Sequence, residues 1–387
     1  MSKLYLDLRA LSAVPDPYLA ATQDIMSYSG ANVGNFAFRH ALKSLININE
    51  YKVVDYTAFN HAVAKEKPKS VVISCANWLC ATEQYEKSNA VRAATIEKAE
   101  CPITVFGLGA QAKTKQNDFK LGPNTERLAK VIAERSVKVS VRDEFTLNTL
   151  EKIGITNAIV TGCPSNFINL NKQLGSSISD KCQIIIDKQP SWQDLKIHFS
   201  EFSGGHKSSG QVLHETLEIL LASPSFYVIQ SPVLFPFVLN EDDKIPGEYL
   251  TNKPESIKAT KDVRRFLKSK IMHFSSIDAW MDFARTCDIS TGMRIHGNML
   301  PLQSGVPSVV IGHDSRTNGL CDMMGIPVMS PEQFVENTKV SPSRLIEFIQ
   351  REIADYDQKR TAIGQIFKNY IEDNGLAPSD SLNDFLG

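Results

Sequence analysis

Short runs of β-branched and apolar residues alternate with longer amphipathic stretches along most of this chain. In the first half, the runs that predict buried strands are 53–54, 70–74, 103–106, 137–141 and 158–161. The apolar spacing between them predicts helices over residues 35–44, 88–99, 124–134 and 144–153. Strands that alternate with helices pair in parallel, because each helix returns the chain to the edge where the next strand begins. The first half is therefore expected to be a parallel sheet with helices on both faces.

A second series of the same kind follows a polar stretch at residues 175–181, which suits a linker or a crossing between domains. Its strands are expected at 183–186, 226–230, 288–291 and 308–311. Its helices are expected at 211–222, 262–268, 277–286 and 295–304. Residues 243–261 contain prolines and many charges and are expected to form a loop, whereas 341–386 are expected to be helical again.

This organisation predicts two α/β halves that face a cleft. The expected parts are an N-terminal domain over 1–175, a C-terminal domain over 176–340, and C-terminal helices over 341–387 that pack back on the body.

The charges of the chain are almost balanced, with 42 Lys and Arg against 43 Asp and Glu and a formal net charge of −1. Such a balance gives no electrostatic footprint for duplex nucleic acid or for an anionic membrane surface. A local cluster of arginines can still hold a small anionic ligand. The longest apolar stretch, residues 227–239, is interrupted by Pro232 and Pro236, so no transmembrane segment is expected.

Seven cysteines are scattered along the chain, with neither a Cys-x-x-Cys pair nor a Cys/His ligand set. This pattern argues against a disulfide scaffold and against structural zinc. Asp7 and Arg9 lie where a signal peptide would need an unbroken apolar core. We expect a soluble, cytoplasmic protein that needs no metal and no cofactor, and the sequence leaves its oligomeric state open.

In parallel sheets, ligands bind at the carboxyl ends of strands, where loops lead into helices. Arg294 and His296 lie at such a turn, between the strand expected at 288–291 and the helix expected at 295–304. The free N–H groups of a helix start favour an anion, and an arginine there can grip a carboxylate or phosphate with two hydrogen bonds. An anion would in turn favour the imidazolium form of His296, which suits a proton donor. A surface salt bridge for the arginine and a capping role for the histidine remain the alternative.

Arg142 has a comparable position, because it directly follows the strand expected at 137–141. There it could face a ligand at the helix start, or it could form a local salt bridge with the adjacent Asp143. His313 follows the strand expected at 308–311 and precedes Asp314 and Arg316.

Two glycine-containing loops precede or follow expected elements. Residues 30–35 form a Gly/Asn-rich loop before the first long helix, and residues 107–112 match the spacing G-x-G-x-x-A. Glycines let the backbone approach a ligand closely, but ordinary turn chemistry explains both loops as well. The second loop follows about the third strand and lacks a clear acidic partner, so it is a weak nucleotide-binding signal.

The order of these motifs resembles the polysaccharide pyruvyl transferase family over residues 25–330. The most specific parts of the resemblance are Ser-x-Arg-Asp, here ending in Arg142 and Asp143, and Arg-hydrophobic-His-Gly, here Arg294 to Gly297. Suggestive parts are the early Gly/Asn loop and the segments 160–164 and 304–311.

The resemblance implies a GT-B-like architecture of two Rossmann-like halves and transfer of the pyruvyl group of phosphoenolpyruvate onto two sugar hydroxyls as a cyclic ketal. It further implies that the acceptor is a sugar or a glycan precursor. The pathway implied is biosynthesis of a cell-surface polysaccharide, such as an exopolysaccharide. Matched by motif, Arg142, Arg294 and His296 hold or activate the donor. With the loops, the expected site comprises a catalytic set of His296, Arg294 and Arg142 and a donor- or substrate-binding set of Gly30, Asn32, Gly34, Asn35, Gly109, Gly297 and Arg316.

The chain departs from the family pattern at three positions. Asn35 and Cys163 stand where the family often has Asp, and Arg316 stands where Lys is common. These departures leave the acceptor open. Two other functions share the expected architecture: a glycosyltransferase of GT-B type that uses a nucleotide sugar, and a non-catalytic protein that binds a sugar or an anion.

Overall fold

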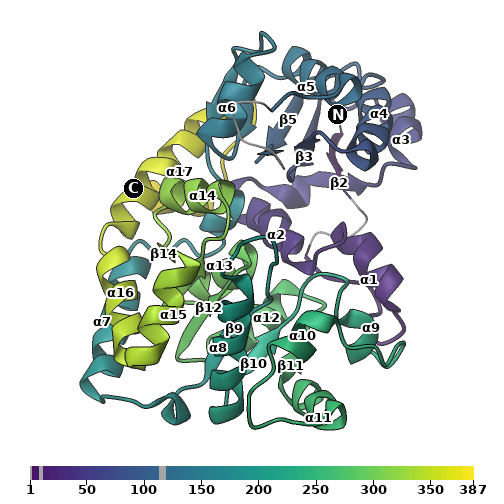
Figure 1. Cartoon of the computed structure of the whole chain (residues 1–387). Coiled ribbons are helices and arrows are strands. Elements are labelled where there is room, and N and C mark those ends of the chain that lie inside the picture. Colours follow the sequence, from purple (N-terminus) through teal and green to yellow (C-terminus); the bar gives the residue numbers. More distant parts are fainter. Residues whose placement is uncertain (1, 8–11, 113–118) are drawn as a thin grey trace. The chain divides into compact units, whose positions relative to one another are not determined.

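The computed structural model describes residues 2–7, 12–112 and 119–387 of the chain. These residues form two compact units (Figure 1). Unit 1 comprises residues 1–11, 38–170 and 360–387, and unit 2 comprises 12–37 and 171–359. The expected boundaries at 175 and 340 divide the chain differently. The early segment 12–37 belongs to the second unit, and only the last part of the C-terminal helices, from residue 360, belongs to the first.

Unit 1 contains a parallel sheet in the order β2-β1-β3-β5. Its strands are β1 (Lys3–Leu6), β2 (Tyr51–Val54), β3 (Ser70–Ser74) and β5 (Ile103–Phe106). A parallel pair, β7 (Val139–Val141) and β8 (Ala158–Val160), continues this sheet beyond β5. The link is Leu108, whose N–H donates to the Ser140 carbonyl and whose carbonyl accepts from the Arg142 N–H, both at 3.0 Å. A short parallel pair is formed by β4 (Leu79–Cys80) and β6 (Ala110–Gln111).

The helices of unit 1 include α4 and α5, which pack against each other beside this sheet (Figure 1). Side-chain caps begin several of them: Thr82 accepts from the Tyr85 N–H at the start of α4, and Asp143 accepts from the Thr146 N–H at the start of α6. The helices are α2 (Phe36–Leu45, from residue 38 on), α3 (Phe59–Glu66), α4 (Glu83–Ile96), α5 (Pro123–Arg135), α6 (Glu144–Glu151), the end of α17 (Tyr356–Asp373) and α18 (Asp380–Leu386).

Unit 2 contains a six-stranded parallel sheet in the order β11-β10-β9-β12-β13-β14. Its strands are β9 (Ile197–Ser200), β10 (Phe226–Val228), β11 (Ile271–Met272), β12 (Ile289–Gly292), β13 (Ser308–Ile311) and β14 (Val328–Met329). Its α-helices are α1 (Thr22–Ser29), α7 (Leu174–Asp187), α8 (Ser209–Ala222), α9 (Phe235–Val238), α10 (Gly247–Thr251), α11 (Thr260–Lys270), α12 (Ile277–Ala284), α13 (Ile295–Gln303), α14 (Ser315–Met324), α15 (Pro331–Val340), α16 (Pro342–Glu352) and the start of α17.

Short 3-10 turns complete both units: η1 (Val33–Asn35) and η5 (Trp192–Asp194) in unit 2, and η2 (Ile48–Glu50) and η4 (Pro164–Phe167) in unit 1.

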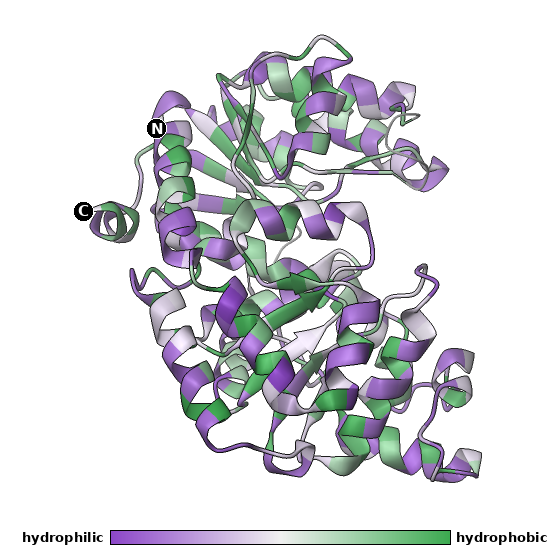
Figure 2. Ribbon diagram, turned by 60° about the vertical axis from the view of Figure 1, so that its left-hand side comes forward, coloured by the Kyte–Doolittle hydropathy of each residue, from purple (hydrophilic) through white to green (hydrophobic). Residues whose placement is uncertain are grey.

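Hydrophobic residues are concentrated along the strands of both sheets and on the helix faces that cover them (Figure 2). Strands β3, β5, β12 and β13 are buried along their whole length, as expected for parallel strands covered on both faces. The fold class is therefore confirmed as α/β, with two parallel-sheet halves of Rossmann-like organisation.

Most expected elements are present within two residues of their expected bounds, but one region is wrong. Residues 175–181 and 183–186 were expected to be a linker and a strand, whereas both lie in the single helix α7. The burial of Leu174, Ile178 and Cys182 explains the helix, because residues four apart lie on one helical face. The expected loop at 243–261 contains the short helix α10. The sequence pattern also missed strands β1 and β9 and the two-residue strands β4, β6, β11 and β14.

Candidate functional site

The carboxyl ends of four neighbouring strands in unit 2 form the edge that carries the predicted site. Strands β10, β9, β12 and β13 are adjacent in the sheet and run in the same direction. Glu201 follows β9, Gln230 lies just beyond β10, Arg294 lies just beyond β12, and His313 lies just beyond β13. Parallel strands bring these positions to one edge of the sheet, which is where ligands bind in this class of fold.

The turn from β12 into α13 is held in one conformation by glycine and asparagine. Gly292 has φ of +141°, and a Cβ there would overlap the backbone and side chain of Ser200. The Asn298 amide nitrogen lies 2.9 Å from each of three acceptors, Ser200 Oγ and the carbonyls of Gly292 and Arg294, which share its two N–H donors. The Arg294 N–H donates to Ser200 Oγ at 3.2 Å. The backbone at Arg294 is therefore held in place by hydrogen bonds to Ser200 and Asn298.

A buried chain of hydrogen bonds supports this asparagine. Ser290 Oγ donates to Asn298 Oδ1 at 3.0 Å and lies 3.1 Å from His198 Nδ1. Trp280 Nε1 donates to His198 Nε2 at 2.9 Å. Because Nε2 accepts, the proton of the neutral ring is on Nδ1, which donates to Ser290. Burial lowers the pKa of His198 to about 3, so the ring stays neutral and this direction of donation is maintained.

The Arg294 side chain is oriented by a buried carboxylate. Its Nε is buried 3.8 Å from Glu201 Oε2. Glu201 is itself 1% exposed and accepts from the Ser231 N–H (2.8 Å), Ser231 Oγ (2.7 Å) and the Gln230 N–H (3.2 Å). Burial raises the pKa of Glu201, whereas the positive charge of Arg294 and these hydrogen bonds oppose the rise.

The interaction with Glu201 leaves the other hydrogen-bond donors of the Arg294 guanidinium available. Among the residues that the structure describes, none accepts a hydrogen bond from the Arg294 side chain, which is 28% exposed. Its terminal nitrogens therefore present an unoccupied fork of donors, the geometry that binds a carboxylate or a phosphate.

Arg316 and His313 belong to the same electrostatic neighbourhood. Asp314 caps α14 by accepting from the Thr317 N–H at 2.6 Å, and its other oxygen lies 3.6 Å from Arg316 Nη2 and 3.8 Å from His313 Nε2. Burial lowers the pKa of His313; the positive charges of Arg316 and Arg294 lower it further, and Asp314 opposes them. That Arg316 and Arg294 hold one ligand stays a prediction.

His296 lies in the first turn of α13 and is 9% exposed. The Gly/Asn loop lies against it, because a Cβ on Gly34 would come within 3.1 Å of the His296 Cβ and 2.9 Å of Gln230 Oε1. The Val33 N–H donates to the Gln230 carbonyl at 2.9 Å, which attaches this loop to the end of β10. Gly297 is similarly close-packed, since its Cβ would meet Ser200.

The other members of that loop have local roles. Asn32 Oδ1 accepts from the Gly34 N–H at 2.8 Å and caps η1. Asn35 donates to the Ser29 carbonyl at 3.0 Å and to the Gly30 carbonyl at 3.2 Å. Gly30 has φ of +67° and ends α1. Turn chemistry thus accounts for Gly30 and Asn35, whereas Gly34 brings the backbone close to His296.

Arg142 lies in unit 1 and has a different environment. Its Nε donates to the Gly107 carbonyl at 2.8 Å, Nη2 to the Cys75 carbonyl at 3.0 Å and Nη1 to Asn77 Oδ1 at 3.4 Å. The guanidinium also lies 5.1 Å from the centre of the Phe38 ring, and the residue is 3% exposed. These contacts tie together the ends of β3, β5 and β7. The alternative salt bridge to Asp143 is not formed, because Asp143 caps α6 instead.

Gly109 belongs to this same interior cluster. A Cβ there would come within 2.5 Å of Asn77 Oδ1 and 3.2 Å of Arg142 Cδ. Gly107, at the start of the loop, has φ of +71°. Close packing around Arg142 accounts for the glycines of this loop without a bound nucleotide.

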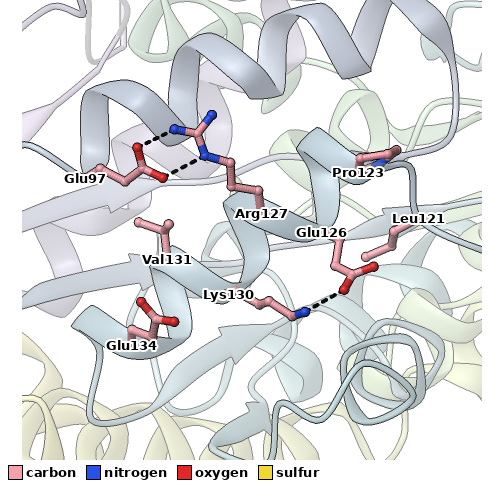
Figure 3. A pocket seen from close by; sticks show the side chains of 8 residues that line it. All are labelled: Glu97, Leu121, Pro123, Glu126, Arg127, Lys130, Val131 and Glu134. Carbon is pink, nitrogen blue, oxygen red and sulfur yellow. Dashed lines mark hydrogen bonds and ion pairs between the residues drawn. The ribbon is translucent and has the colours of Figure 1, made fainter.

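A surface depression of about 560 Å³ lies elsewhere in unit 1, between α4 and α5 (Figure 3). Four of its five charged residues are paired with each other: Arg127 Nε donates to Glu97 Oε1 at 2.7 Å, and Lys130 Nζ to Glu126 Oε1 at 2.6 Å. None of the predicted site residues lines it. This depression is therefore not the predicted site.

Residues 2–7, 12–112 and 119–387 include no helix with the length and apolarity that crossing a membrane requires. The same ranges contain no group of three or more His, Cys, Asp or Glu side chains that could hold a metal ion.

Sequence reasoning missed Glu201, His198, Trp280 and Asn298. Glu201 and His198 lie on or next to β9, a strand whose sequence, Ile-His-Phe-Ser, has the polar alternation of a surface rather than a buried strand. A polar residue directly after a strand end is the signal that could have identified Glu201, once β9 was recognised.

Comparison with solved structures finds distant similarities. S. aureus MnaA in complex with UDP is 13% identical, with 98% of this chain and 100% of that chain covered and a TM-score of 0.46. UDP-N-acetylglucosamine 2-epimerase from Rickettsia bellii is 13% identical (96% and 98% covered, TM-score 0.45), and a glycosyltransferase from Rickettsia africae is 9% identical (96% and 98% covered, TM-score 0.43).

None of the curated proteins compared matches the chain. The family model described as polysaccharide pyruvyl transferase matches residues 32–315, which include residues 32–35 of the Gly/Asn loop, Arg142, Arg294 and His296. The chain therefore belongs to the polysaccharide pyruvyl transferase family.

Proposed function

We propose that this protein transfers the pyruvyl group of phosphoenolpyruvate onto a sugar as a cyclic ketal during biosynthesis of a cell-surface polysaccharide. Membership of the family supports a transferase of polysaccharide biosynthesis. The observation that carries the choice of donor is the Arg294 fork, which is oriented by Glu201, adjoins the start of α13 and is not used by any described side chain or carbonyl. A site of this kind favours a ligand with a carboxylate or a phosphate, and phosphoenolpyruvate has both.

In this proposal, Arg294 and Arg316 hold the two anionic groups of the donor. Arg294 follows β12, and Arg316 lies at the start of α14, which follows the adjacent parallel strand β13, so both come from neighbouring strand ends of one sheet edge. Their charges also stabilise the negative charge that develops on phosphate oxygen as the C–O bond breaks. Asn32, Gly34 and Gly297 would then form the close-packed backbone beside the donor.

That Arg142 binds phosphoenolpyruvate remains a prediction, but its contacts favour a role in supporting the local structure. All three of its guanidinium nitrogens already donate to acceptors within unit 1. We propose that Arg142 chiefly holds the strand ends and the Gly109 loop in place.

The chemistry proposed for His296 is general acid catalysis. The enol carbon must gain a proton before the central carbon can accept a sugar oxygen, and an imidazolium at a helix start beside an anion can provide it. A first hydroxyl then bonds to the central carbon, phosphate departs, and a second hydroxyl closes the ring. This scheme uses positive side chains and does not require a metal.

We also propose a cytoplasmic location, where phosphoenolpyruvate is made. The cysteines that the structure describes form no disulfide, which is consistent with a reducing compartment.

The test is incubation of the full chain with phosphoenolpyruvate and a panel of free, nucleotide-linked and lipid-linked glycosides. The proposal predicts phosphate release together with a product whose mass spectrum shows an added pyruvate ketal. Nucleotide release from a sugar nucleotide would instead identify a glycosyltransferase, and binding without turnover across the panel would identify a non-catalytic binding protein.

A further inference from the structure

His313 is a partly buried histidine at the proposed donor site that the scheme above does not use. It lies in the loop between β13 and α14, and its side chain is 12% exposed. Its Nδ1 is buried with no hydrogen-bond partner among the described residues, whereas Nε2 lies 3.8 Å from Asp314 Oδ2. Nε2 is therefore the nitrogen through which this ring can exchange a proton with a ligand.

The charged groups that face His313 come from two elements. Asp314 and Arg316 belong to the start of α14, and Arg294 comes from the start of α13. Arg294 is in turn paired with Glu201, which lies beyond it. His313 thus lies at the strand end next to the one that carries Arg294, and its Nε2 faces the same Asp314 oxygen as Arg316.

We propose that His313 is the general base that takes the proton from the attacking sugar hydroxyl and later returns it to the departing phosphate. This inference rests on the proposed function, because it assigns a second catalytic residue to the same reaction. Burial and the two arginines favour the neutral ring in the empty site, and a neutral ring is the form that can accept a proton. The donor brings negative charge that offsets the arginines, so its binding raises the pKa of His313 and makes proton transfer to it easier.

The overall reaction needs a group that moves protons, because both protons lost from the sugar hydroxyls end up in the products. Two hydroxyl hydrogens are lost from the sugar; one ends on the methyl carbon of the ketal, and the other ends on inorganic phosphate. The new bonds are two C–O bonds and one C–H bond, and the bond between carbon and the phosphate oxygen breaks. No oxidant or reductant is involved. His296 supplies the proton to carbon and regains a proton from the second hydroxyl as the ring closes, and His313 carries the proton of the first hydroxyl to the departing phosphate oxygen.

The chain offers a matched control in His273. This residue also directly follows a strand of the same sheet, β11, and burial lowers its pKa as it does for His313. Its Nδ1 is buried with no partner among the described residues, and its ring packs on Phe235 at 5.4 Å. β11 is the edge strand at one end of the sheet, with three strands between it and β13. His273→Gln therefore measures the cost of removing a partly buried imidazole from this sheet edge.

The experiment compares the wild type, His313→Gln and His273→Gln in the phosphate-release assay, with kcat, KM for phosphoenolpyruvate and the pH profile as readouts. General base catalysis contributes about 10²–10⁴-fold, so we expect kcat of His313→Gln to fall at least about 100-fold. KM should change by less than about threefold, because Arg294 and Arg316 remain. The decline of wild-type kcat at low pH should disappear, and His273→Gln should keep both kcat and this decline.

Binding of phosphoenolpyruvate, measured by calorimetry in two buffers of different ionisation enthalpy, gives an independent readout. Near pH 6, wild type and His273→Gln should take up protons on binding, and His313→Gln should take up fewer. A His313→Gln variant with kcat within about threefold of wild type, or with an unchanged low-pH decline, would overturn the role of His313 and leave the proposed function intact. A wild type that releases no phosphate from phosphoenolpyruvate would overturn both.

Discussion

Replacement of Arg294 is the sharpest test of its anion-binding role. Its contact with Glu201 allows the effect on phosphoenolpyruvate binding to be measured separately from the effect on protein stability. Arg294→Ala removes both the donor fork and the positive charge 3.8 Å from the buried Glu201 carboxylate. Truncating one partner of a buried charge contact costs about 2–5 kcal/mol, which corresponds to roughly 30-fold to several-thousand-fold in an equilibrium. We expect Arg294→Ala to weaken phosphoenolpyruvate affinity by at least about 30-fold and to lower the thermal stability of the apo protein.

The two losses can be separated with Glu201. In Arg294→Ala the stability loss arises from a carboxylate left buried without a positive partner, so the second change Glu201→Gln should restore much of the melting temperature. It should not restore phosphoenolpyruvate affinity, because the fork is still absent. Arg294→Lys keeps a charge near Glu201 and should retain most of the stability, but it should lose affinity, since an ammonium cannot make the paired contacts.

The pH dependence of this stability loss has a definite sign. Burial raises the pKa of Glu201 in the folded state above its unfolded value, and loss of Arg294 raises it further. The folded state then binds more protons than the unfolded state, so folding becomes more favourable as the pH falls through the folded-state pKa towards the ordinary value near 4.5. The melting-temperature deficit of Arg294→Ala should therefore shrink between pH 8 and pH 5, as measured by calorimetry or circular dichroism.

An exposed arginine serves as the control. Arg285 is 69% exposed and pairs with Asp282 at the surface, so Arg285→Ala should leave both affinity and stability nearly unchanged. Normal phosphoenolpyruvate affinity in Arg294→Ala, or a stability deficit that Glu201→Gln does not relieve, would refute the reasoning.

Four further substitutions test the support of the site. Gly292→Ala should lower the free energy of unfolding by about 2 kcal/mol or more, because the new Cβ meets Ser200 at a positive φ, and urea titration measures it. Trp280→Phe leaves His198 Nε2 without its donor and should cost about 1–3 kcal/mol in the same titration. Arg142→Ala should lower the melting temperature and leave KM for phosphoenolpyruvate nearly unchanged, since the Arg142 guanidinium donates hydrogen bonds to carbonyls of the protein. A raised KM with an unchanged melting temperature would instead show that Arg142 binds phosphoenolpyruvate. His296→Gln should lose about 10²–10⁴-fold in kcat, and retained turnover in a stopped assay would mean that it only positions the donor.

The sequence predicted the parts of the fold that are apolar and locally periodic. The runs at 70–74, 103–106 and 308–311 are strands with those bounds, because fully buried parallel strands read as continuous apolar segments. Strand β9 escaped because its His198 and Ser200 point into a polar network rather than an apolar core. The apolar residues at 184–186 suggested a strand, yet Ile184 is 56% exposed on α7.

The candidate site was predictable only as far as its motifs extend along the chain. Arg294 and His296 could be found because they directly follow a recognisable strand, and the structure places them with the loop 30–35 in one unit. That association depends on the chain entering unit 2 before α2, which no local pattern reveals. Whether an arginine is committed to protein carbonyls, as Arg142 is, or left open, as Arg294 is, depends on long-range contacts that sequence spacing does not encode.

The central claim is the transfer of pyruvyl from phosphoenolpyruvate, and the most direct measurement is the reaction in D₂O with a panel of glycosides, followed by NMR of the product. The account predicts one inorganic phosphate per ketal and a methyl group that carries a single deuterium, because the proton added to the enol carbon comes from an exchangeable group. Unchanged phosphoenolpyruvate, together with nucleotide release when a sugar nucleotide is supplied instead, would contradict it.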